Sequence, residues 1–151
     1  LLAELVLRKF LCRGGITYGK IIHNDKIIFG PAFIEAYNLE KNKATVPRII
    51  LDKSIIDLGT NKQSYFNDNE ELNSIITKDS DDYYYIDYFL KIENIVVEPL
   101  SKIENHFNLL KQLTMDCLDI KEKFVWLKEK YNKSVQEAMT KYRYLQFQMI
   151  D

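Results

Sequence analysis

The sequence predicts an α+β fold: a largely antiparallel sheet with helices on one face, followed by a C-terminal helical extension. Three observations carry this prediction. Residues 16–22 and 26–29 are rich in β-formers and flank a polar turn, which indicates a β-hairpin. Apolar residues at helical spacing predict helices over 1–10 and 32–41. Beyond Pro99 the apolar residues recur every three or four positions, which is typical of amphipathic helices.

The composition is that of an ordinary globular protein: 151 residues, 46% hydrophobic and 28% charged, with a net charge of -1. Such a charge gives no broad basic field for binding nucleic acid. No apolar stretch approaches the ~20 residues that span a bilayer, and no signal-peptide pattern is present. Cys12 and Cys117 have apolar neighbours, which favours buried thiols over a disulfide. We therefore expect a soluble cytoplasmic protein.

The first part of the chain alternates helix and strand signals. The chain opens on Leu1 in the middle of a helical pattern, which indicates a fragment of a longer protein. Pro31 suits the first turn of the helix predicted over 32–41. Residues 47–51 form an apolar run of strand length, and Asp52 is placed to cap a short helix over residues 53–58.

The middle of the chain is less regular. Residues 59–69 are polar and predict a loop, and residues 70–76 could form one or two helical turns. The tyrosine-rich run 83–88 predicts a strand, with Asp81 and Asp82 as the turn before it. Stacking of a nucleobase is the alternative interpretation of these tyrosines, but β propensity explains them with fewer assumptions.

The helical extension begins with a capping-box pattern at Ser101 to Glu104. A second helical stretch runs from Phe124 toward Met149, with a predicted break near Asn132. The prediction is a helical pair or one bent helix, and the domains are assigned as residues 1–98 and 99–151. Aromatic and apolar residues of the second stretch are interpreted as core or as an interface with a second protomer: Phe124, Trp126, Leu127 and Tyr131.

Two runs of sequence resemble a known family. RGGITYGK at 13–20 and FGPAFIEAYNLE at 29–40 are similar to the glycine-rich hairpin and following helix of class III nucleotidyl cyclases. In that family the strand carries R/H-x-G-I-x-x-G and the helix reads roughly G-x-x-V-N-x-A-x-R-L-E. A strand glycine lets a backbone or a ligand approach closely, and a strand–glycine–helix junction can present N–H groups to phosphate. Either run alone is commonly just a turn and a helix start with a structural role. The two runs together, at the spacing found in the family, favour the family.

The resemblance covers residues 1–90 less specifically and implies the C-terminal half of a ferredoxin-like cyclase, or palm, sheet. It implies formation of a 3′,5′-cyclic nucleotide from a nucleoside triphosphate with release of pyrophosphate, in a homodimer whose sites lie between two domains. Mg²⁺ or Mn²⁺ is the implied cofactor, with its two aspartate ligands upstream of Leu1. The helical tail resembles the extension of standalone prokaryotic cyclases, including the pyrimidine cyclases of anti-phage defence.

The resemblance assigns roles to several positions, and three of them depart from the family pattern. Ile34 stands where the family has a ribose-orienting Asn, and Asn38 where it has the Arg that stabilises the transition state. Asn38 can donate a neutral hydrogen bond, which is weaker than a charge-assisted one, whereas Ile34 can donate nothing. Ile27 falls near the base-selecting position. Its apolar side chain argues against selection of a purine by the usual polar contact and is compatible with a pyrimidine substrate or with an altered pose of the nucleotide.

Other candidates follow from the same segment. Phe29 and Gly30 are assigned to nucleotide binding at the junction with the helix. Glu35, beside the transition-state position, is a candidate general base or metal ligand, and a solvated or salt-bridged helix carboxylate is the alternative. Arg13 could contact phosphate from the strand start, or it could be an ordinary surface residue.

The remaining polar residues favour structural roles. Asp79, Asp81 and Asp82 could suggest a metal site, but acids before a strand are common in turns. His23 and His106 are isolated, which predicts a turn and a helix surface respectively, and a zinc site lacks enough ligands.

The sequence thus supports three hypotheses. The first is a nucleotidyl cyclase, and the second is a cyclase-like domain that has lost catalysis and binds nucleotide or dimerises as a regulatory module. A palm-domain polymerase such as a diguanylate synthase ranks last, since the hairpin carries no GGDEF-like motif.

Overall fold

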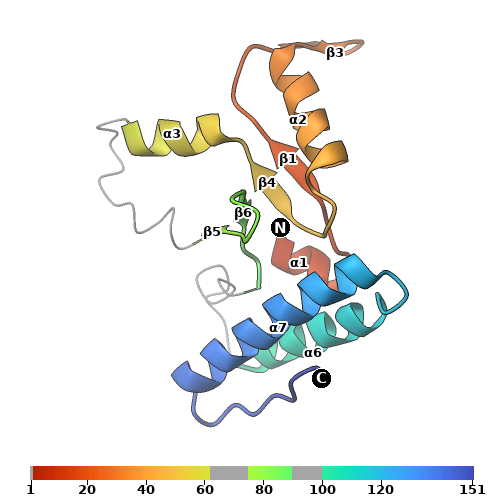
Figure 1. The fold of residues 1–151 in the computed structure, drawn as a ribbon, viewed down its shortest axis with the longest axis vertical. Helices are drawn as coiled ribbons and strands as arrows, with labels where there is room; N and C mark the ends of the chain where they lie inside the picture. The colour runs from red at the N-terminus through yellow and green to blue at the C-terminus, as the bar shows by residue number, and fades with distance from the viewer. Residues whose placement is uncertain (1, 62–74, 90–99) are drawn as a thin grey trace. The chain divides into compact units, whose positions relative to one another are not determined.

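The computed structural model describes residues 2–61, 75–89 and 100–151, which form two compact units. One unit comprises the described residues of 1–12 and 88–151, and the other spans 13–87. The described part of the chain is α+β, as predicted (Figure 1). The predicted domain boundary between residues 98 and 99 lies outside the described residues. The N-terminal helix groups with the C-terminal helices and not with the sheet.

The sheet unit contains six strands and two helices within its described residues. In chain order these are β1 (Gly14–Ile16), β2 (Ile22–His23), β3 (Ile28–Phe29), α2 (Pro31–Asn42), β4 (Ile49–Leu51), α3 (Lys53–Asn61), β5 (Ile76–Lys78) and β6 (Tyr84–Ile86).

The main sheet has four strands in the order β1-β4-β6-β5. β1 and β4 are parallel, with Gly15 opposite Ile50, whereas β4–β6 and β5–β6 are antiparallel. A parallel pair needs a crossover connection, and α2 lies in the segment that links β1 to β4. The sheet is therefore mixed, and the expectation of a largely antiparallel sheet holds for two of its three strand pairs.

The predicted hairpin is present in a shorter form. β2 and β3 pair with each other as a separate two-stranded sheet, with Ile22 opposite Phe29. Its turn is closed by Asn24, whose Oδ1 accepts hydrogen bonds from the backbone N–H groups of Lys26 and Ile27, both at 3.0 Å. Asparagine favours such turns because its short side chain can bond the backbone two or three residues on. Ile16, assigned to the hairpin from sequence, instead belongs to the main sheet.

Two further local predictions have clear outcomes. Asp52 caps α3 as expected, since its Oδ1 accepts a hydrogen bond from the backbone N–H of Ser54 at 2.9 Å. The helical turns predicted over 70–76 are wrong at Ile76, which begins β5. Ile76 pairs with Ile86 in the sheet, a position that suits a β-branched side chain. Residues 70–74 lie outside the described residues.

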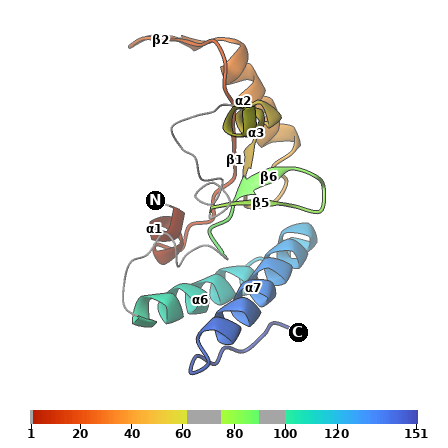
Figure 2. The same cartoon turned by 90° about the vertical axis from the view of Figure 1, so that its left-hand side faces the viewer.

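The helical unit contains α1 (Leu2–Leu7), α6 (Leu100–Met115) and α7 (Lys121–Lys141). α6 and α7 form the predicted helical pair, and α1 packs on α6 (Figure 2). Their core is built from aliphatic and aromatic residues that include Val6, Phe89, Phe107, Leu110, Leu127, Tyr131 and Val135. Phe124 and Trp126 pack against this core, so the interpretation of the α7 residues as core is confirmed.

Three predictions for this unit are wrong. α7 continues without a break through Asn132 and ends at Lys141 instead of continuing to Met149. The chain leaves the helix after Lys141, and Leu145 and Ile150 are buried where it folds back onto the unit. His106 does not lie on a helix surface: its side chain is 1% exposed among the core residues of α6.

Cys12 and Cys117 are free thiols, both partly buried. Among the helices described, none combines the length and the apolar character needed to cross a bilayer.

Candidate functional site

Residues 13–40, which resemble the cyclase family, are called the family-like segment. Its Gly15 allows α2 to approach β1 closely. A Cβ atom at Gly15 would lie 2.6 Å from the backbone oxygen of Ala36 and 2.6 Å from Cβ of Leu39. Non-bonded carbon atoms prefer a separation of ~3.5–4.0 Å, so any side chain at this position would have to push the helix away. The close approach that the glycine permits is that of a helix backbone. Gly15 thus has a packing role in this structure.

The junction between β3 and α2 also requires glycine. Gly30 has φ 150°, and a Cβ atom there would lie 2.5 Å from the carbonyl oxygen of Lys20. The first turn of the helix is partly satisfied within the chain: Pro31 has no N–H, and Ala32 donates its N–H to Lys20 O at 3.3 Å. Less donor capacity is therefore left for a phosphate than a strand–glycine–helix junction suggests from sequence.

The segment between β1 and β2 lies along the start of α2. Thr17 donates its hydroxyl to the carbonyl oxygen of Ala32 at 3.1 Å, and a Cβ at Gly19 would lie 3.3 Å from Cβ of Ala32. These contacts fix the position of the helix start.

Three candidate residues share the outer face of α2. Ile34, Glu35 and Asn38 are exposed, whereas Leu39 is buried and Ala36 faces β1. Ile34 and Asn38 are four residues apart and therefore neighbours on the helix surface. The structure thus brings these three side chains together on one accessible face of the helix, away from the sheet.

The hairpin adds an exposed apolar surface beside this face. Its members are large hydrophobic residues that are 42–69% exposed, and we call them the hairpin–helix surface: Tyr18, Ile21, Ile22, Ile27, Ile28, Phe29, Phe33, Ile34 and Tyr37. Large apolar patches on a soluble protein mark interaction or binding sites. The predicted nucleotide-contacting residues Ile27 and Phe29 belong to this surface.

Arg13 pairs with the helix that carries the other candidates. Its Nε lies 2.6 Å from Oε1 of Glu40, and both side chains are partly exposed. The two ends of the family-like segment are therefore joined by an ion pair. A phosphate would have to compete with Glu40 for this guanidinium.

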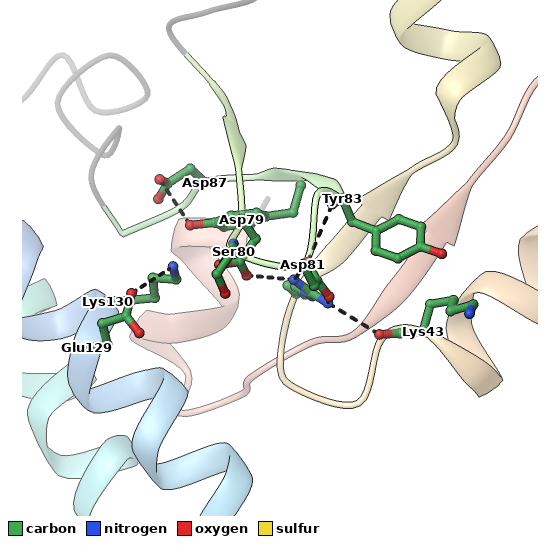
Figure 3. A network of polar contacts seen from close by, with 10 residues as sticks. Lys43, Asp79, Ser80, Asp81, Tyr83, Asp87, Glu129 and Lys130 are labelled. Carbon is green, nitrogen blue, oxygen red and sulfur yellow. Dashed lines mark hydrogen bonds and ion pairs between the residues drawn. The ribbon is translucent and has the colours of Figure 1, made fainter.

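An ionic network joins Arg48, directly before β4, to the turn between β5 and β6. Arg48 donates from Nη1 to Oδ2 of Asp79 at 2.6 Å and to Oδ1 of Asp81 at 2.9 Å, and from Nη2 to Oδ2 of Asp81. The side chains of Arg48 and Asp79 are 4% and 2% exposed. Figure 3 shows Asp79 and Asp81 on the turn that this arginine holds.

The network accounts for the acids that sequence alone left open. The hydrogen bonds that Asp81 accepts from Arg48 lower the pKa of Asp81 below its ordinary value. Asp82 pairs with Lys78 at 2.7 Å on the surface. The interpretation of these aspartates as turn acids therefore agrees with the structure. Arg48 was not predicted as part of a site, although an arginine beside an apolar run is itself a signal that buried carboxylates lie nearby.

Burial and neighbouring carboxylates also change the pKa of a tyrosine on β6. Tyr85 is 1% exposed and donates its hydroxyl to Oδ2 of Asp87 at 3.4 Å. Burial, reinforced by the negative charges of Asp87 and Asp79, raises the pKa of this tyrosine strongly. Tyr85 therefore stays protonated at neutral pH.

A shallow pocket of about 560 Å³ opens at the end of β4. It is lined by Leu51, Asp52, Lys53, Ile56, Asp57, Lys78, Asp81, Asp82, Tyr83 and Tyr84. None of the site residues predicted from sequence contributes to its lining. Across the described ranges, no three His, Cys, Asp or Glu side chains are grouped as a metal site would require.

Comparison with known protein families, with characterised proteins and with solved structures finds no match to this chain.

Proposed function

We propose that this chain is the C-terminal part of a class III nucleotidyl cyclase domain, which converts a nucleoside triphosphate to a 3′,5′-cyclic nucleotide and pyrophosphate. The observation that carries the proposal is the register of the segment from Arg13 to Glu40 combined with its geometry. Positions 34, 35 and 38, which the resemblance assigns to the reaction, share the accessible face of α2.

The proposal gives each candidate a defined task. Asn38 donates a neutral hydrogen bond to the reacting phosphate, in place of the cationic residue typical of the family. Ile27 and Phe29 cover the faces or edges of the nucleobase by apolar contact. Ile34 packs against the ribose, and Glu35 is the acid closest to these groups along the helix.

The site is completed by chain segments beyond these residues. The hairpin–helix surface is too apolar to remain in water without a covering partner. We propose that the upstream half of the domain and a second protomer cover it. The metal ions implied by the resemblance have no ligand set among the described residues, and the proposal assigns their ligands to the upstream half.

A second candidate function is favoured by the side chains themselves. Ile34 and Asn38 lack the donors and charge that the family uses, which suits a cyclase-like domain that binds nucleotide or dimerises without turnover. Nucleotide binding without a cyclic product would identify this regulatory module.

The test is product analysis with the full-length protein. Each of the four ribonucleoside triphosphates is incubated with the protein and Mn²⁺, and products are separated and identified by mass. A cyclic mononucleotide from at least one substrate is the expected result. Its absence with all four, from a folded protein that contains the upstream aspartates, would refute the enzyme. A linked dinucleotide would instead indicate a palm-domain polymerase.

A further inference from the structure

The last residues of the chain lie on the helical unit as a bound peptide would. After α7 ends at Lys141, residues 145–150 run back along the helix (Figures 1 and 2). The order of contacts shows the direction: Phe147 meets Met139, and Ile150 meets Asn132, seven residues earlier in the helix. The segment is therefore antiparallel to α7. We call residues 145–150 the tail segment.

The helical unit recognises the backbone of the tail segment. Asn132 donates from Nδ2 to the carbonyl oxygen of Ile150 at 2.8 Å, and its Oδ1 accepts from the N–H of Ile150 at 2.9 Å. The hydroxyl of Tyr131 donates to the carbonyl oxygen of Gln148 at 3.1 Å. Such bonds bind an extended chain whatever its side chains, as the added strand does in peptide-binding domains. A side-chain amide thus takes the place of a neighbouring strand.

Three apolar side chains of the tail segment supply specificity. Leu145 and Ile150 are 3% and 7% exposed, and both belong to the core cluster of the unit. Phe147 packs against that cluster, with its ring centre 5.0 Å from that of Phe107. The intervening residues Gln146, Gln148 and Met149 are exposed. Three apolar anchors with a recognised backbone between them are the features of a peptide-docking groove.

Few residues join the tail segment to the helix that binds it. The backbone N–H groups of Tyr142 and Leu145 close a short turn, and the tail segment follows directly. An element held through such a short connection and by contacts to one unit can be exchanged between identical protomers at little cost, because the contacts made in both arrangements are the same.

We propose that the groove lined by Asn132, Tyr131 and Met139 is a peptide-docking site, and that its partner is the tail segment of a second copy of this chain. We propose a second copy as the partner because both copies have the same sequence. The same six residues fill the groove within one copy, so a second copy presents the same anchors and the same backbone. Exchange of the tail segment links two copies through their helical units. This interface involves no residue of the hairpin–helix surface and does not depend on the proposed cyclase activity.

The experiment uses the full chain with a weakened tail segment. Ile150→Asp places a charge at a buried anchor and leaves the groove intact. A labelled peptide RYLQFQMID, corresponding to residues 143–151, is titrated into this variant, and binding is read by fluorescence anisotropy. Binding that raises the thermal midpoint of the variant is expected, whereas the same peptide with Asp at position 150 should bind at least about tenfold more weakly. Ile150→Ala is the milder variant for use if Ile150→Asp does not fold.

Matched substitutions locate the site. Added to Ile150→Asp, Asn132→Ala removes two hydrogen bonds to the peptide and should weaken binding by about tenfold or more. Asn105→Ala, an exposed asparagine on α6, should leave binding unchanged.

A second copy is tested with the single variant Asn132→Ala, which has a weakened groove but an intact tail segment. When the Asn132→Ala chain is mixed with the Ile150→Asp variant, it should raise the thermal midpoint of the Ile150→Asp variant as the peptide does. Failure of the peptide to bind a folded Ile150 variant would overturn the groove. Failure of the Asn132→Ala chain to stabilise that variant would overturn the second copy as occupant.

Discussion

Two adjacent glycines in β1 allow a direct test of what the glycine-rich segment does. In Gly15→Ala the new methyl group would lie 2.6 Å from both the Ala36 carbonyl oxygen and the Leu39 Cβ atom of α2. A backbone carbonyl in a helix cannot move aside alone, so the helix must shift. In Gly14→Ala the nearest atoms are side-chain carbons of Ile49 at 3.7 and 3.8 Å, which is ordinary van der Waals contact.

The two substitutions should change the free energy of unfolding in opposite directions. Overpacking of this kind costs about 1–3 kcal/mol, and Gly15→Ala should be destabilised by that amount. At Gly14 the methyl group fits, and the lower entropy of the unfolded chain should make the variant equal to wild type or about 0.4–1 kcal/mol more stable. The chemistry of both changes is identical, so their difference isolates the contact with α2.

The assay is denaturant unfolding of the two variants side by side, with amide hydrogen exchange of β1 and β4 to report on the sheet unit alone. Gly15→Ala should speed exchange in both strands, and Gly14→Ala should not. Equal stability of the two variants would refute the packing role of Gly15 and would favour a role in approaching a ligand.

Two further predictions concern buried polar groups. Arg48→Met leaves Asp79 buried without this partner and should cost about 3–5 kcal/mol of unfolding free energy, whereas loss of the exposed pair in Lys78→Met should have little effect; comparable losses would contradict the network. Burial lowers the pKa of His106 to about 4 from 6.5. The unfolded chain therefore takes up a proton first as the pH falls, so stability should be flat above pH ~6.5 and decrease toward pH 4 by up to about 1.4 kcal/mol per pH unit. Unfolding curves at several pH values should show a shallower decrease in His106→Leu, and an unchanged slope would refute this origin.

Local signals in the sequence predicted most of the elements. Pro31 and the helical spacing after it located α2, and Asp52 located the start of α3, because caps and first-turn residues act on the helix next to them. The turn at Asn24 was predictable for the same reason.

The misassigned elements depend on distant partners. Ile76 lies in a strand because β6 pairs with it, and the residues next to it in the sequence do not predict that pairing. Asn132 resembled a helix break, but its amide is occupied by Ile150, and α7 continues through it. His106 stands three residues after Ile103 and four before Leu110, so helical spacing placed it on the apolar face of α6, and only its polar residue type argued against burial.

The sequence predicted which residues form the candidate site but not the contacts that these residues make. Sequence register placed Ile34, Glu35 and Asn38 on one helix, and the structure places them on one exposed face. The ion pair between Arg13 and Glu40, and the use of Gly15 for helix packing, required three-dimensional contacts that no local pattern encodes.

The most direct test of the central proposal compares two asparagines of α2 in the full-length protein. Asn38→Ala removes the hydrogen-bond donor assigned to the reacting phosphate, whereas Asn42→Ala changes the same residue type one turn further along, at an exposed position with no assigned role. With the triphosphate that gives cyclic product, Asn38→Ala should lower kcat about tenfold or more while Asn42→Ala retains wild-type activity. Equal kcat values for wild type and both variants would contradict the assignment of this helix face to the reaction.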